Sequence, residues 1–574
     1  MNVLKTMRVS SSEPCPRVSG RRRVAAEFSG YLEDESRTSA EPVEVIFFPE
    51  TIGQVCSAVR ECARDGLSVT VTGARTGIVG GAVPLESNAV LALEKLNHIH
   101  SLRYEAERDE FFARVEAGVI LSEFHEALRT TASHDLPWAD AETRRAGERR
   151  IDQAGRGLFY PVDPTETSAQ LGGTISTNAS GARTFYYGPT REWVEAITVV
   201  LASGEVLRLR RGETVAPSPP DSKFILETTD GTRRELPVPH LNLPATKHQA
   251  GYHMAPPPGA DGIDAIDLFI GSEGTLGVVV EAELRLTFPP RERLFATAFL
   301  PTEDRAVRFV EEIRSHSRRK STADSNSSPE ASEGMALSDG IALRPLAMEY
   351  IGPEAVRLLR DKREREGASS GVPPLREDAG CAVYLELAFD GDDELRRCYE
   401  MLEELLREAG TGPAETWAGF SPKDLDGMKG FRHAVPEHVN GIIGRRKREV
   451  PGLHKVGTDM AVPDERLEEA LALYRSRLGE SGLEHVIFGH VGDNHLHVNI
   501  LPRSEEELER AMDLYGEFAR EVVKMGGSVA AEHGIGRLKK LFLPIQFGED
   551  ELAAMQRVKD GLDPEGLFNP GVLF

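Results

Sequence analysis

Apolar and polar residues alternate along the chain in patterns that predict both strands and helices. Within residues 44–287, apolar runs such as Val45 to Phe48 and Val69 to Thr72 have the composition of strands. Between these two runs, Thr51 to Arg64 has helical spacing, and its apolar face is formed by Ile52, Val55, Val59 and Cys62. Strand-like and helix-like segments that alternate in this way are typical of an α/β or α+β domain.

A second domain is predicted from Phe295 onward. Its helix-like segments, separated by strand-like ones, are Glu303 to Arg314, Glu394 to Ala409 and Asp464 to Leu478. Three stretches of low complexity interrupt the order: Ala139 to Arg156, Arg211 to Gly262 and Ser315 to Gly340. Because these stretches are charged, rich in Pro, Thr and His, or mostly small and polar, we expect loop insertions there rather than functional elements.

Composition and charge narrow the class of protein. The 574 residues, 40% of them hydrophobic and 28% charged, predict a soluble globular protein of two or three domains. The 68 basic and 92 acidic residues give a net charge of -24. This charge opposes nonspecific binding to nucleic acid or to anionic lipid, so we expect neither as a partner.

The cysteines and the apolar segments indicate the cellular compartment to expect. The five cysteines contain no C-x-x-C pair, so neither a disulfide framework nor a cysteine-held iron-sulfur cluster is expected. The first 25 residues lack an apolar core, and no segment reaches the roughly 18 to 20 apolar residues of a membrane span. We expect a cytoplasmic protein, with any association with the inner membrane peripheral and made through a partner.

The densest group of metal-binding residue types lies near the C-terminus. Leu496, Val498 and Ile500 are apolar and alternate with polar residues, as in a strand with one buried face. The alternating polar residues are His495, His497 and Asn499, and the preceding Gly-Asp-Asn turn can fold His490 back towards them. Two imidazoles are therefore expected to converge.

A second acid and imidazole follow about 35 residues later, as Glu532 and His533 in Ala-Glu-His-Gly-Ile-Gly. Two His nitrogens and one carboxylate oxygen suit Zn, Mn, Fe or Co, and three protein ligands leave positions open for a substrate. One histidine alone would more often be structural, but this cluster favours a catalytic metal site. By itself it also permits a metal-dependent hydrolase.

Three Gly-rich segments lie in the first domain: Thr72 to Gly81, Gly172 to Gly181 and Gly271 to Gly277. The first follows a predicted strand, where bare backbone N-H groups can bind a pyrophosphate. None matches G-x-G-x-x-G or a Walker loop, so neither nucleotide-binding fingerprint applies. Three such segments in one domain predict a long diphosphate cofactor between subdomains.

With these motifs the chain resembles the FAD-linked oxidases and dehydrogenases of the vanillyl-alcohol oxidase superfamily. The branch is the one that holds glycolate oxidase, D-lactate dehydrogenase and D-2-hydroxyglutarate dehydrogenase. The resemblance runs from about Glu44 to Phe574. It is carried by the three Gly-rich segments, Asp163-Pro164, Gly489 to Asp493, Glu532 to Gly534, Leu562 to Pro564 and Asn569-Pro570.

The resemblance implies an α+β fold. Residues 43–290 would form a PCMH-type FAD-binding domain of two subdomains, with inserts at about 139–156 and 211–262. Residues 291–555 would form an α+β cap that binds the substrate, with an insert at about 315–340. Residues 1–42 would be an extension, and residues 556–574 would pack back on the flavin domain.

Site residues carried over by position follow from the same resemblance. FAD, bound noncovalently because no His or Cys for attachment is evident, would contact Gly73, Ala74, Arg75, Thr76, Gly77, Gly80, Gly81, Asp163, Gly172, Gly173, Ser176, Asn178, Gly274, Gly277, Val279 and Asn569. A divalent metal, with Zn ahead of Mn, Fe or Co, would be held by His490, His497 and Glu532. His533 would be the catalytic base, and the substrate would contact Arg432, Lys455, Asn499 and His533.

Two departures from the family pattern stand out. Relatives often have Gly-Asp-Gly-Asn where this chain has Gly492 to His495, so His495 is an extra imidazole that is either a ligand or a proton relay. Ser176 and Ser180 stand where Ala and Gly are common, and both are small enough to keep the backbone path.

The expected reaction is oxidation of a 2-hydroxy acid, of the D-lactate, glycolate or D-2-hydroxyglutarate type, to the 2-oxo acid with hydride transfer to flavin N5. Electrons would leave to a quinone, an electron-transfer flavoprotein, a cytochrome or a separate iron-sulfur subunit, and a homodimer is one expected assembly. The alternatives are an alkylglycerone-phosphate-synthase-like FAD enzyme that acts on a phosphorylated lipid, and a noncatalytic flavin-binding scaffold.

Overall fold

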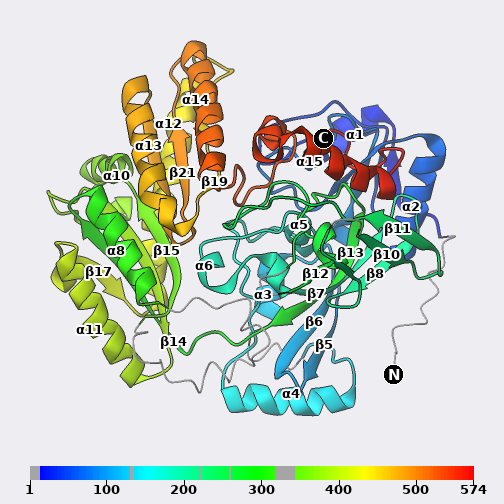
Figure 1. The fold of residues 1–574 in the computed structure, drawn as a ribbon, viewed down its shortest axis with the longest axis horizontal. Coiled ribbons are helices and arrows are strands. Elements are labelled where there is room, and N and C mark those ends of the chain that lie inside the picture. Colours follow the sequence, from blue (N-terminus) through cyan, green and yellow to red (C-terminus); the bar gives the residue numbers. More distant parts are fainter. Residues whose placement is uncertain (1–12, 130–134, 220–221, 257–259, 318–342) are drawn as a thin grey trace.

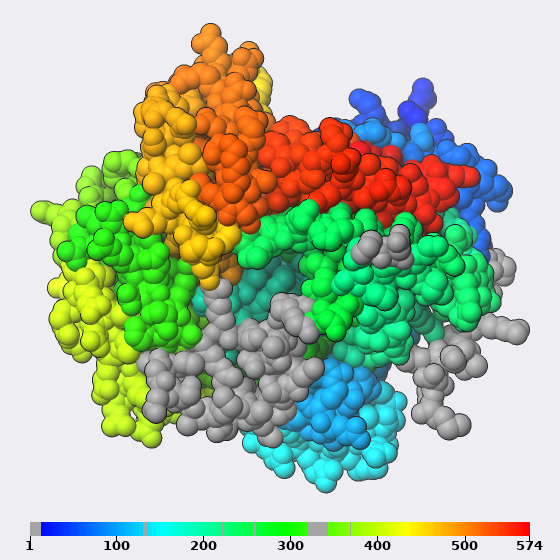
Figure 2. All heavy atoms as spheres, in the orientation of Figure 1, coloured from blue at the N-terminus to red at the C-terminus, as the bar shows by residue number. Residues whose placement is uncertain are grey.

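The computed structural model describes residues 13–129, 135–219, 222–256, 260–317 and 343–574, which form two lobes (Figure 1). The first lobe contains two larger sheets and two short strand pairs, and the second lobe, called the cap here, contains one large sheet. The chain then returns from the cap to the first lobe, and Figure 2 shows this last part as a red band across it. The structure is mixed helix and sheet, as the predicted α+β class requires.

The smaller sheet of the first lobe has the order β1-β2-β4-β3. Its strands are β1 (Arg17–Ser19), β2 (Val45–Phe47), β4 (Ala89–Ala92) and β3 (Val69–Thr72). Helix α2 (Ile52–Asp65) begins at Thr51, whose side chain accepts a hydrogen bond from Gln54 N, and ends at Gly66 in the left-handed conformation. Its predicted apolar face packs on β2 and β4. The predicted helix and both predicted strands are confirmed.

The larger sheet of the first lobe has the order β5-β6-β13-β7-β8, and all of its neighbours are antiparallel. Its strands are β5 (Ile99–Glu105), β6 (Glu110–Glu116), β13 (Val278–Leu286), β7 (Val194–Val200) and β8 (Val206–Arg210). The short helices α5 (Leu171–Ser176) and α7 (Ala265–Phe269) contact it, whereas α1 (Arg21–Glu27) packs on β1 and β2 of the smaller sheet. The first lobe also contains α3 (Leu121–Ala127) and α6 (Thr184–Tyr187), of which α6 contacts β15 of the other lobe. The second Gly-rich segment therefore begins as helix α5 and is not a loop throughout.

The segment Ala139 to Arg156, predicted to be a loop, is instead mostly helical. Helix α4 (Ala141–Ala154) occupies it, capped by Asp140, which accepts hydrogen bonds from two backbone N-H groups. The charged composition hid a buried face on which Arg150 pairs with Asp109 at 3.0 Å. Segment 211–262 also has order, as two short strand pairs: β10 (Lys223–Glu227) with β11 (Arg233–Pro237), and β9 (Val215–Pro217) with β12 (Gly262–Asp264). Most of the third stretch, 318–342, lies outside the described residues.

The cap is built on an eight-stranded antiparallel sheet of order β17-β14-β16-β15-β20-β21-β18, with β19 also on β21. The strands are β17 (Thr416–Gly419), β14 (Glu292–Leu300), β16 (Cys381–Phe389), β15 (Pro345–Ile351), β20 (His485–His490), β21 (His495–Ile500), β18 (Val456–Gly457) and β19 (Met460–Ala461). Its helices are α8 (Glu303–Ser315), α10 (Pro353–Glu366), α11 (Asp392–Glu408), α12 (Pro422–Arg446), α13 (Leu467–Ser481) and α14 (Glu505–Lys524). The three helices predicted for this region, α8, α11 and α13, are present.

The end of the chain joins the smaller sheet of the first lobe. After α15 (Leu543–Leu562), Asn569 N donates to Val69 O at 2.8 Å, and Phe568 bridges Val69 in parallel. The buried ammonium of Lys559 donates to Thr275 O at 2.6 Å, beside the third Gly-rich segment. Among the helices described, none is both long and apolar enough to span a bilayer.

Candidate functional site

The candidate site is built on the hairpin of β20 and β21, the edge of the cap sheet that carries the histidines. The register pairs His490 with His495, and the turn between them is the 3-10 helix Val491–Asp493. The ring centroids of His495 and His497 are 4.4 Å apart, and those of His490 and His497 are 5.6 Å apart. Leu496, Val498 and Ile500 point into the core, so the predicted alternation is confirmed.

A second segment, Ala531–Gly536, lies against this hairpin and is called the Glu-His loop here. Asp459 holds it: its two carboxylate oxygens accept hydrogen bonds from Glu532 N at 3.2 Å and His533 N at 2.9 Å. The ring of His533 stacks on that of His497, with centroids 5.3 Å apart and planes 11° apart. Asp459 is fully buried and also pairs with Lys539 at 2.7 Å. Asp459 thus holds the Glu-His loop in place, and its own charge is balanced by Lys539.

Glu532 faces the histidines through one oxygen. Its Oε2 lies 3.2 Å from His490 Nε2, 3.6 Å from His495 Nδ1 and 2.7 Å from Lys247 Nζ. Burial alone would raise the pKa of Glu532, but the charges of Lys247 and His490 outweigh it and hold that pKa well below its ordinary value. Glu532 is therefore a carboxylate, the form that binds a metal ion.

His490 is paired on its other side as well. Its Nδ1 lies 2.6 Å from Glu349 Oε1, and the same oxygen lies 3.3 Å from Arg432 Nη1. Burial lowers the pKa of His490, but the carboxylates of Glu349 and Glu532 outweigh it and raise that pKa to about 10. A carboxylate behind an imidazole fixes the orientation of the ring, as is usual behind metal-ligating histidines.

Two groups of potential metal ligands occur in the described residues, each with its donor atoms within 4.8 Å of one another. They are His490 with His495 and His497, and Asp459 with His497 and His533. Glu532, the third predicted ligand, adjoins the first group through His490 and His495. Neither ring nitrogen of the fully buried His495 makes an aligned hydrogen bond to a described residue, although Nε2 lies 2.9 Å from Asp459 Oδ1. A buried set of imidazoles and carboxylates with an orphaned donor fits a divalent metal.

Burial lowers the pKa of three of the four imidazoles. The pKa of His495 falls to about 4, and those of His497 and His533 also fall. His533 and His497 differ from His495 in access, because both are partly exposed, with 25% of the His533 side chain accessible, whereas His495 is fully buried. A molecule that enters the site can therefore reach His533.

The three Gly-rich segments converge in the first lobe. Gly271 N donates to Ile175 O at 3.0 Å and Glu273 N donates to Ser176 O at 2.8 Å, which joins the second segment to the third. A Cβ on Gly81, in the first segment, would lie 3.8 Å from Glu273 Oε2. Each segment has a non-glycine residue at positive φ, and such turns present successive N-H groups to one side. This arrangement fits a pyrophosphate-containing cofactor.

Several predicted cofactor residues use their side chains within the protein. Arg75 stacks on the ring of Tyr31 at 4.3 Å, and Asn178 Oδ1 accepts from Arg191 N at 2.8 Å. Asn569 links the first and third segments, because its Oδ1 accepts from Val71 N and its Nδ2 donates to Glu273 O. These three side chains hold the shape of the segments.

Some of the remaining predicted cofactor positions pack within the sheet, and others face open space. A Cβ on Gly277 would lie 2.6 Å from Val199, so this glycine, like buried Val279 beside it on β13, packs the sheet. A Cβ on Gly77 or Gly173 would meet open space. Asp163 lies beside the second segment, where burial raises its pKa to about 6 against the opposing effect of Arg183. The other predicted positions, which lie in the three segments themselves, are Gly73, Ala74, Thr76, Gly80, Gly172, Ser176 and Gly274.

The predicted substrate residues lie around the cluster in the cap. Arg432 is on α12, and its guanidinium lies beside Glu349. Lys455 precedes β18, has no hydrogen bond or ion pair to the residues that the structure describes, and burial lowers its pKa. Asn499 is buried on β21 opposite Gly457, so its amide faces the start of the same β18 segment.

Sequence reasoning missed four residues that the structure places at the cluster: Asp459, Glu349, Lys247 and Lys539. Asp459 follows Lys455 by four residues, and a strand-like segment that ends in an acid was a usable signal. Glu349 lies inside β15, whose other residues are almost all apolar, which also singles it out. Lys247 offered no signal, because it lies in the segment predicted to be a functionless insertion.

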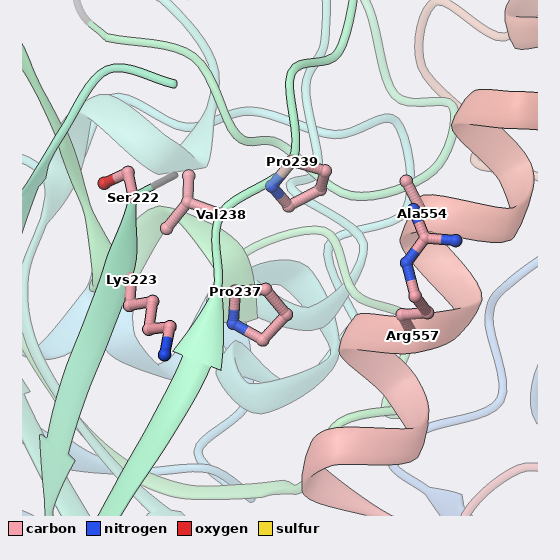
Figure 3. Close-up of a pocket in the computed structure, with 7 residues that line it drawn as sticks. All are labelled: Ser222, Lys223, Pro237, Val238, Pro239, Ala554 and Arg557. Atoms are coloured by element: carbon pink, nitrogen blue, oxygen red, sulfur yellow. The ribbon is translucent and has the colours of Figure 1, made fainter. Parts of the chain in front are cut away.

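One cavity, of about 290 Å³, lies away from this cluster (Figure 3). It is bordered by Lys223 and Pro237 on the β10-β11 hairpin and by Ala554 and Arg557 on α15. None of the residues that line it is an acid or a histidine. Its lining therefore offers no carboxylate or imidazole to a metal ion or to a proton.

Comparison with protein-family models adds a second kind of evidence. Residues 43–136 and 151–210 match the model described as FAD binding domain, and residues 335–573 match FAD linked oxidases, C-terminal domain. The chain belongs to the FAD-linked oxidase family. It is accordingly an FAD-binding oxidoreductase, and the first two of the converging Gly-rich segments lie within the residues that match the FAD binding domain.

Relatives match over nearly the whole chain of this FAD-linked oxidase. A D-lactate dehydrogenase of Anaerostipes hadrus is 27% identical, covering 92% of this chain and 89% of its own. A D-2-hydroxyglutarate dehydrogenase of Xanthomonas citri pv. viticola is 28% identical, covering 96% and 93%. The glycolate oxidase subunit GlcD of Bacillus subtilis is 22% identical, covering 92% and 89%.

Among solved structures, the fold is similar to that of an alkyldihydroxyacetonephosphate synthase. The TM-score is 0.54 at 14% sequence identity, over 93% of this chain and 77% of that one. At this identity the likeness concerns the fold alone.

Proposed function

We propose that this FAD-linked oxidoreductase oxidises a 2-hydroxy acid to the 2-oxo acid with the help of a divalent metal. One observation carries the proposal: a buried cluster of imidazoles and carboxylates includes His533, whose side chain is 25% exposed, in the same lobe as the basic residues Arg432 and Lys455. The names of the relatives, which are dehydrogenases and an oxidase of 2-hydroxy acids, support the substrate class.

Within this proposal His533 takes the proton of the substrate hydroxyl. Its backbone N-H is fixed by Asp459 and its ring by the stack on His497, so its position is set before substrate arrives. His490 and His495 are less exposed, and the partly exposed His497 is a proposed metal ligand, which leaves His533 to meet a substrate proton.

The substrate carboxylate is bound by Arg432 and Lys455. The Arg432 guanidinium already lies beside Glu349 and offers further donors, whereas the Lys455 ammonium is half-buried without a described acidic partner. A partly desolvated cation without a partner is costly on its own, and an anion that binds there relieves the cost. Asn499 lies on the adjoining strand and supplies an amide on the same side.

His490, His497 and Glu532 hold the metal in this proposal, and Zn is the first candidate. When bound, the metal lowers the pKa of the substrate hydroxyl, and noncovalently bound FAD accepts the hydride at N5. The protein itself would supply fixed ligands, because Glu349 pairs with Nδ1 of His490 and Lys247 donates to Oε2 of Glu532.

The electrons would leave to an acceptor outside the chain, for which we propose a quinone, an electron-transfer flavoprotein, a cytochrome or a separate iron-sulfur subunit. The five cysteines support an external acceptor. They are all unpaired, and four of them are buried, including Cys56 and Cys62 in the core against α2.

The experiment is anaerobic mixing of the purified FAD-loaded protein with single hydroxy acids while the visible absorbance of oxidised flavin is followed. The substrates are D-lactate, glycolate and D-2-hydroxyglutarate, with the L-isomers of the chiral acids as matched controls. Bleaching by one of them is the expected result and identifies both the acid and its stereochemistry. A flavin that none of these acids bleaches would overturn the proposed substrate class.

A further inference from the structure

A short segment of the first lobe, Thr246–Gln249, lies on the cap beside the candidate metal site and is called the strap here. Thr246 Oγ1 donates to Val462 O at 3.1 Å, and Gln249 N donates to Ala530 O at 2.7 Å. Between them, His248 Nδ1 lies 2.8 Å from Ser528 Oγ, and Lys247 reaches the carboxylate of Glu532. Four consecutive residues therefore each contact the cap, and one of them enters the metal site.

The Lys247 side chain is inside the protein along with its partner. Its exposure is 4%, that of Glu532 is 11%, and Nζ to Oε2 is 2.7 Å. A buried ammonium this close to a carboxylate is a charge-assisted hydrogen bond with directional strength. The lysine comes from a position 285 residues away in the sequence, so the contact depends on the docking of the two lobes.

We propose that Lys247 is a positioning residue that fixes the carboxylate of Glu532 for the metal. The proposal rests on the proposed function, in which Glu532 is a ligand. A free glutamate side chain has three rotatable bonds, and ordering it on metal binding costs conformational entropy. With Lys247 in place the carboxylate is ordered beforehand, between the ammonium and His490 Nε2.

Charge pairing around the site supports positioning. Three buried acids meet there, and each has its own cationic partner: Lys247 for Glu532, Lys539 for Asp459, and His490 with Arg432 for Glu349. Removal of the Lys247 ammonium leaves Glu532 with His490, which is shared with Glu349, and with His495 at 3.6 Å. The Glu532 carboxylate is then no longer fixed in one position.

If Lys247 instead opposed metal binding, its removal would have the opposite effect on metal affinity. A fixed ammonium near the site would repel a divalent cation, and its removal would then tighten metal binding. Positioning predicts that removal weakens metal binding, by roughly 10- to 100-fold as for other residues that orient metal ligands. The sign of the change in metal affinity distinguishes the two.

The experiment measures the dissociation constants of Zn²⁺ and Mn²⁺ by competition with a chromogenic chelator. It uses full-length FAD-loaded protein stripped of metal, with FAD content and melting temperature measured alongside. Lys247→Met is expected to bind both metals roughly 10- to 100-fold more weakly than wild type. Lys247→Arg keeps the buried charge and hence the fold, and is expected to lose less. Thr246→Val removes a neighbouring contact of the strap and is the matched control, with unchanged affinity.

A double-mutant cycle with Glu532→Gln shows whether Lys247 acts through that carboxylate. If it does, Lys247→Met weakens metal binding no further once Glu532 is already replaced. Equal or tighter binding in Lys247→Met, when Lys247→Arg also matches wild type, overturns the positioning role and leaves the proposed function intact. Wild-type protein that binds neither metal overturns the metal site and the positioning role together, whereas the hydroxy-acid experiment on flavin is unaffected.

Discussion

The histidine cluster and the neighbouring Lys455 differ in how their charges are satisfied. In the cluster each buried acid has a cationic partner at 2.6 to 2.7 Å: Glu349 with His490, Glu532 with Lys247, and Asp459 with Lys539. Lys455 has no ion pair or hydrogen bond within the described ranges. The acids of the cluster, which must keep one geometry, are fixed by ion pairs within the protein. Lys455, which is proposed to bind the substrate carboxylate, has no such partner within the described residues.

This difference predicts two kinds of variant. Changes in the paired cluster should affect proton transfer, metal binding or stability, while a change at the open cation should affect substrate affinity. The predictions below test this division, in order of decreasing expected effect.

The largest effect is expected for His533→Ala. Loss of the proton acceptor should slow anaerobic flavin reduction by roughly 10²- to 10⁴-fold, with substrate affinity and FAD content nearly unchanged. Stopped-flow absorbance measures the rate. His240→Ala, at an exposed histidine of the first lobe, is the control. Reduction at nearly the wild-type rate would rule out His533 as the base.

Asp459→Asn should come next, chiefly through stability. The amide cannot balance Lys539, so a buried ammonium loses its partner, and the cost is expected to be about 3 to 5 kcal/mol. Thermal and denaturant unfolding of the FAD-loaded protein measure it, with Asp513→Asn on the exposed face of α14 as the control. If both variants have the same free energy of unfolding, Asp459 does not hold the Glu-His loop in place.

Lys455→Met should have a smaller effect, and on affinity. Loss of one charged contact to the substrate carboxylate is expected to raise the KM roughly 10- to 100-fold, with a minor change in kcat. Steady-state kinetics with an artificial electron acceptor measure both constants. Lys524→Met, at an exposed lysine, is the control. A loss of kcat at unchanged KM would place Lys455 in the paired cluster instead.

The smallest effect is expected for the pH dependence of Glu273→Gln. Glu273 accepts hydrogen bonds from Ile535 N and Gly536 N of the Glu-His loop, at 2.8 and 2.7 Å. Burial raises the pKa of Glu273 to about 7 against the opposing effect of these bonds. A raised pKa favours the protonated form in the folded state, so its contribution to stability is lost as pH rises from the ordinary value through about 7.

Glutamine does not titrate, so the melting temperature of wild type minus that of Glu273→Gln should fall as pH rises through that range, by the equivalent of roughly 1.4 kcal/mol for each pH unit. Calorimetry at several pH values measures the difference, with Glu549→Gln at an exposed position as the control. A difference that stays constant with pH would show that Glu273 does not titrate in the folded state.

The two segments predicted as insertions show what a sequence pattern can and cannot give. Helix α2 and strand β21 were predictable because each carries a local alternation, with caps or turns beside it. Helix α4 was missed because its buried face contains Gly147 and Arg150, which do not score as apolar. The prediction failed at α4 because of a local sequence pattern. A search for the Asp140 cap and the Gly155 end would have found this helix.

The error at 211–262 is of another kind. Lys247 lies among residues with no apolar period, and its importance comes only from Glu532, which is far away along the chain. The same holds for Asp459, whose partners lie 73 to 80 residues on. The histidine and Glu-His motifs could be predicted from the residue types that metals require, whereas the groups that hold those motifs are chosen by tertiary contact.

The central claim is that hydroxy-acid oxidation depends on a metal held by the cluster. The direct measurement is flavin bleaching by the active hydroxy acid in three samples: protein as purified with metal, the same protein after chelation, and the chelated protein after Zn²⁺ or Mn²⁺ is restored. The account predicts that chelation abolishes bleaching while FAD stays bound, that metal restores it, and that Glu532→Gln is not restored at the same metal concentration. Full bleaching in protein shown by elemental analysis to be free of metal would contradict it.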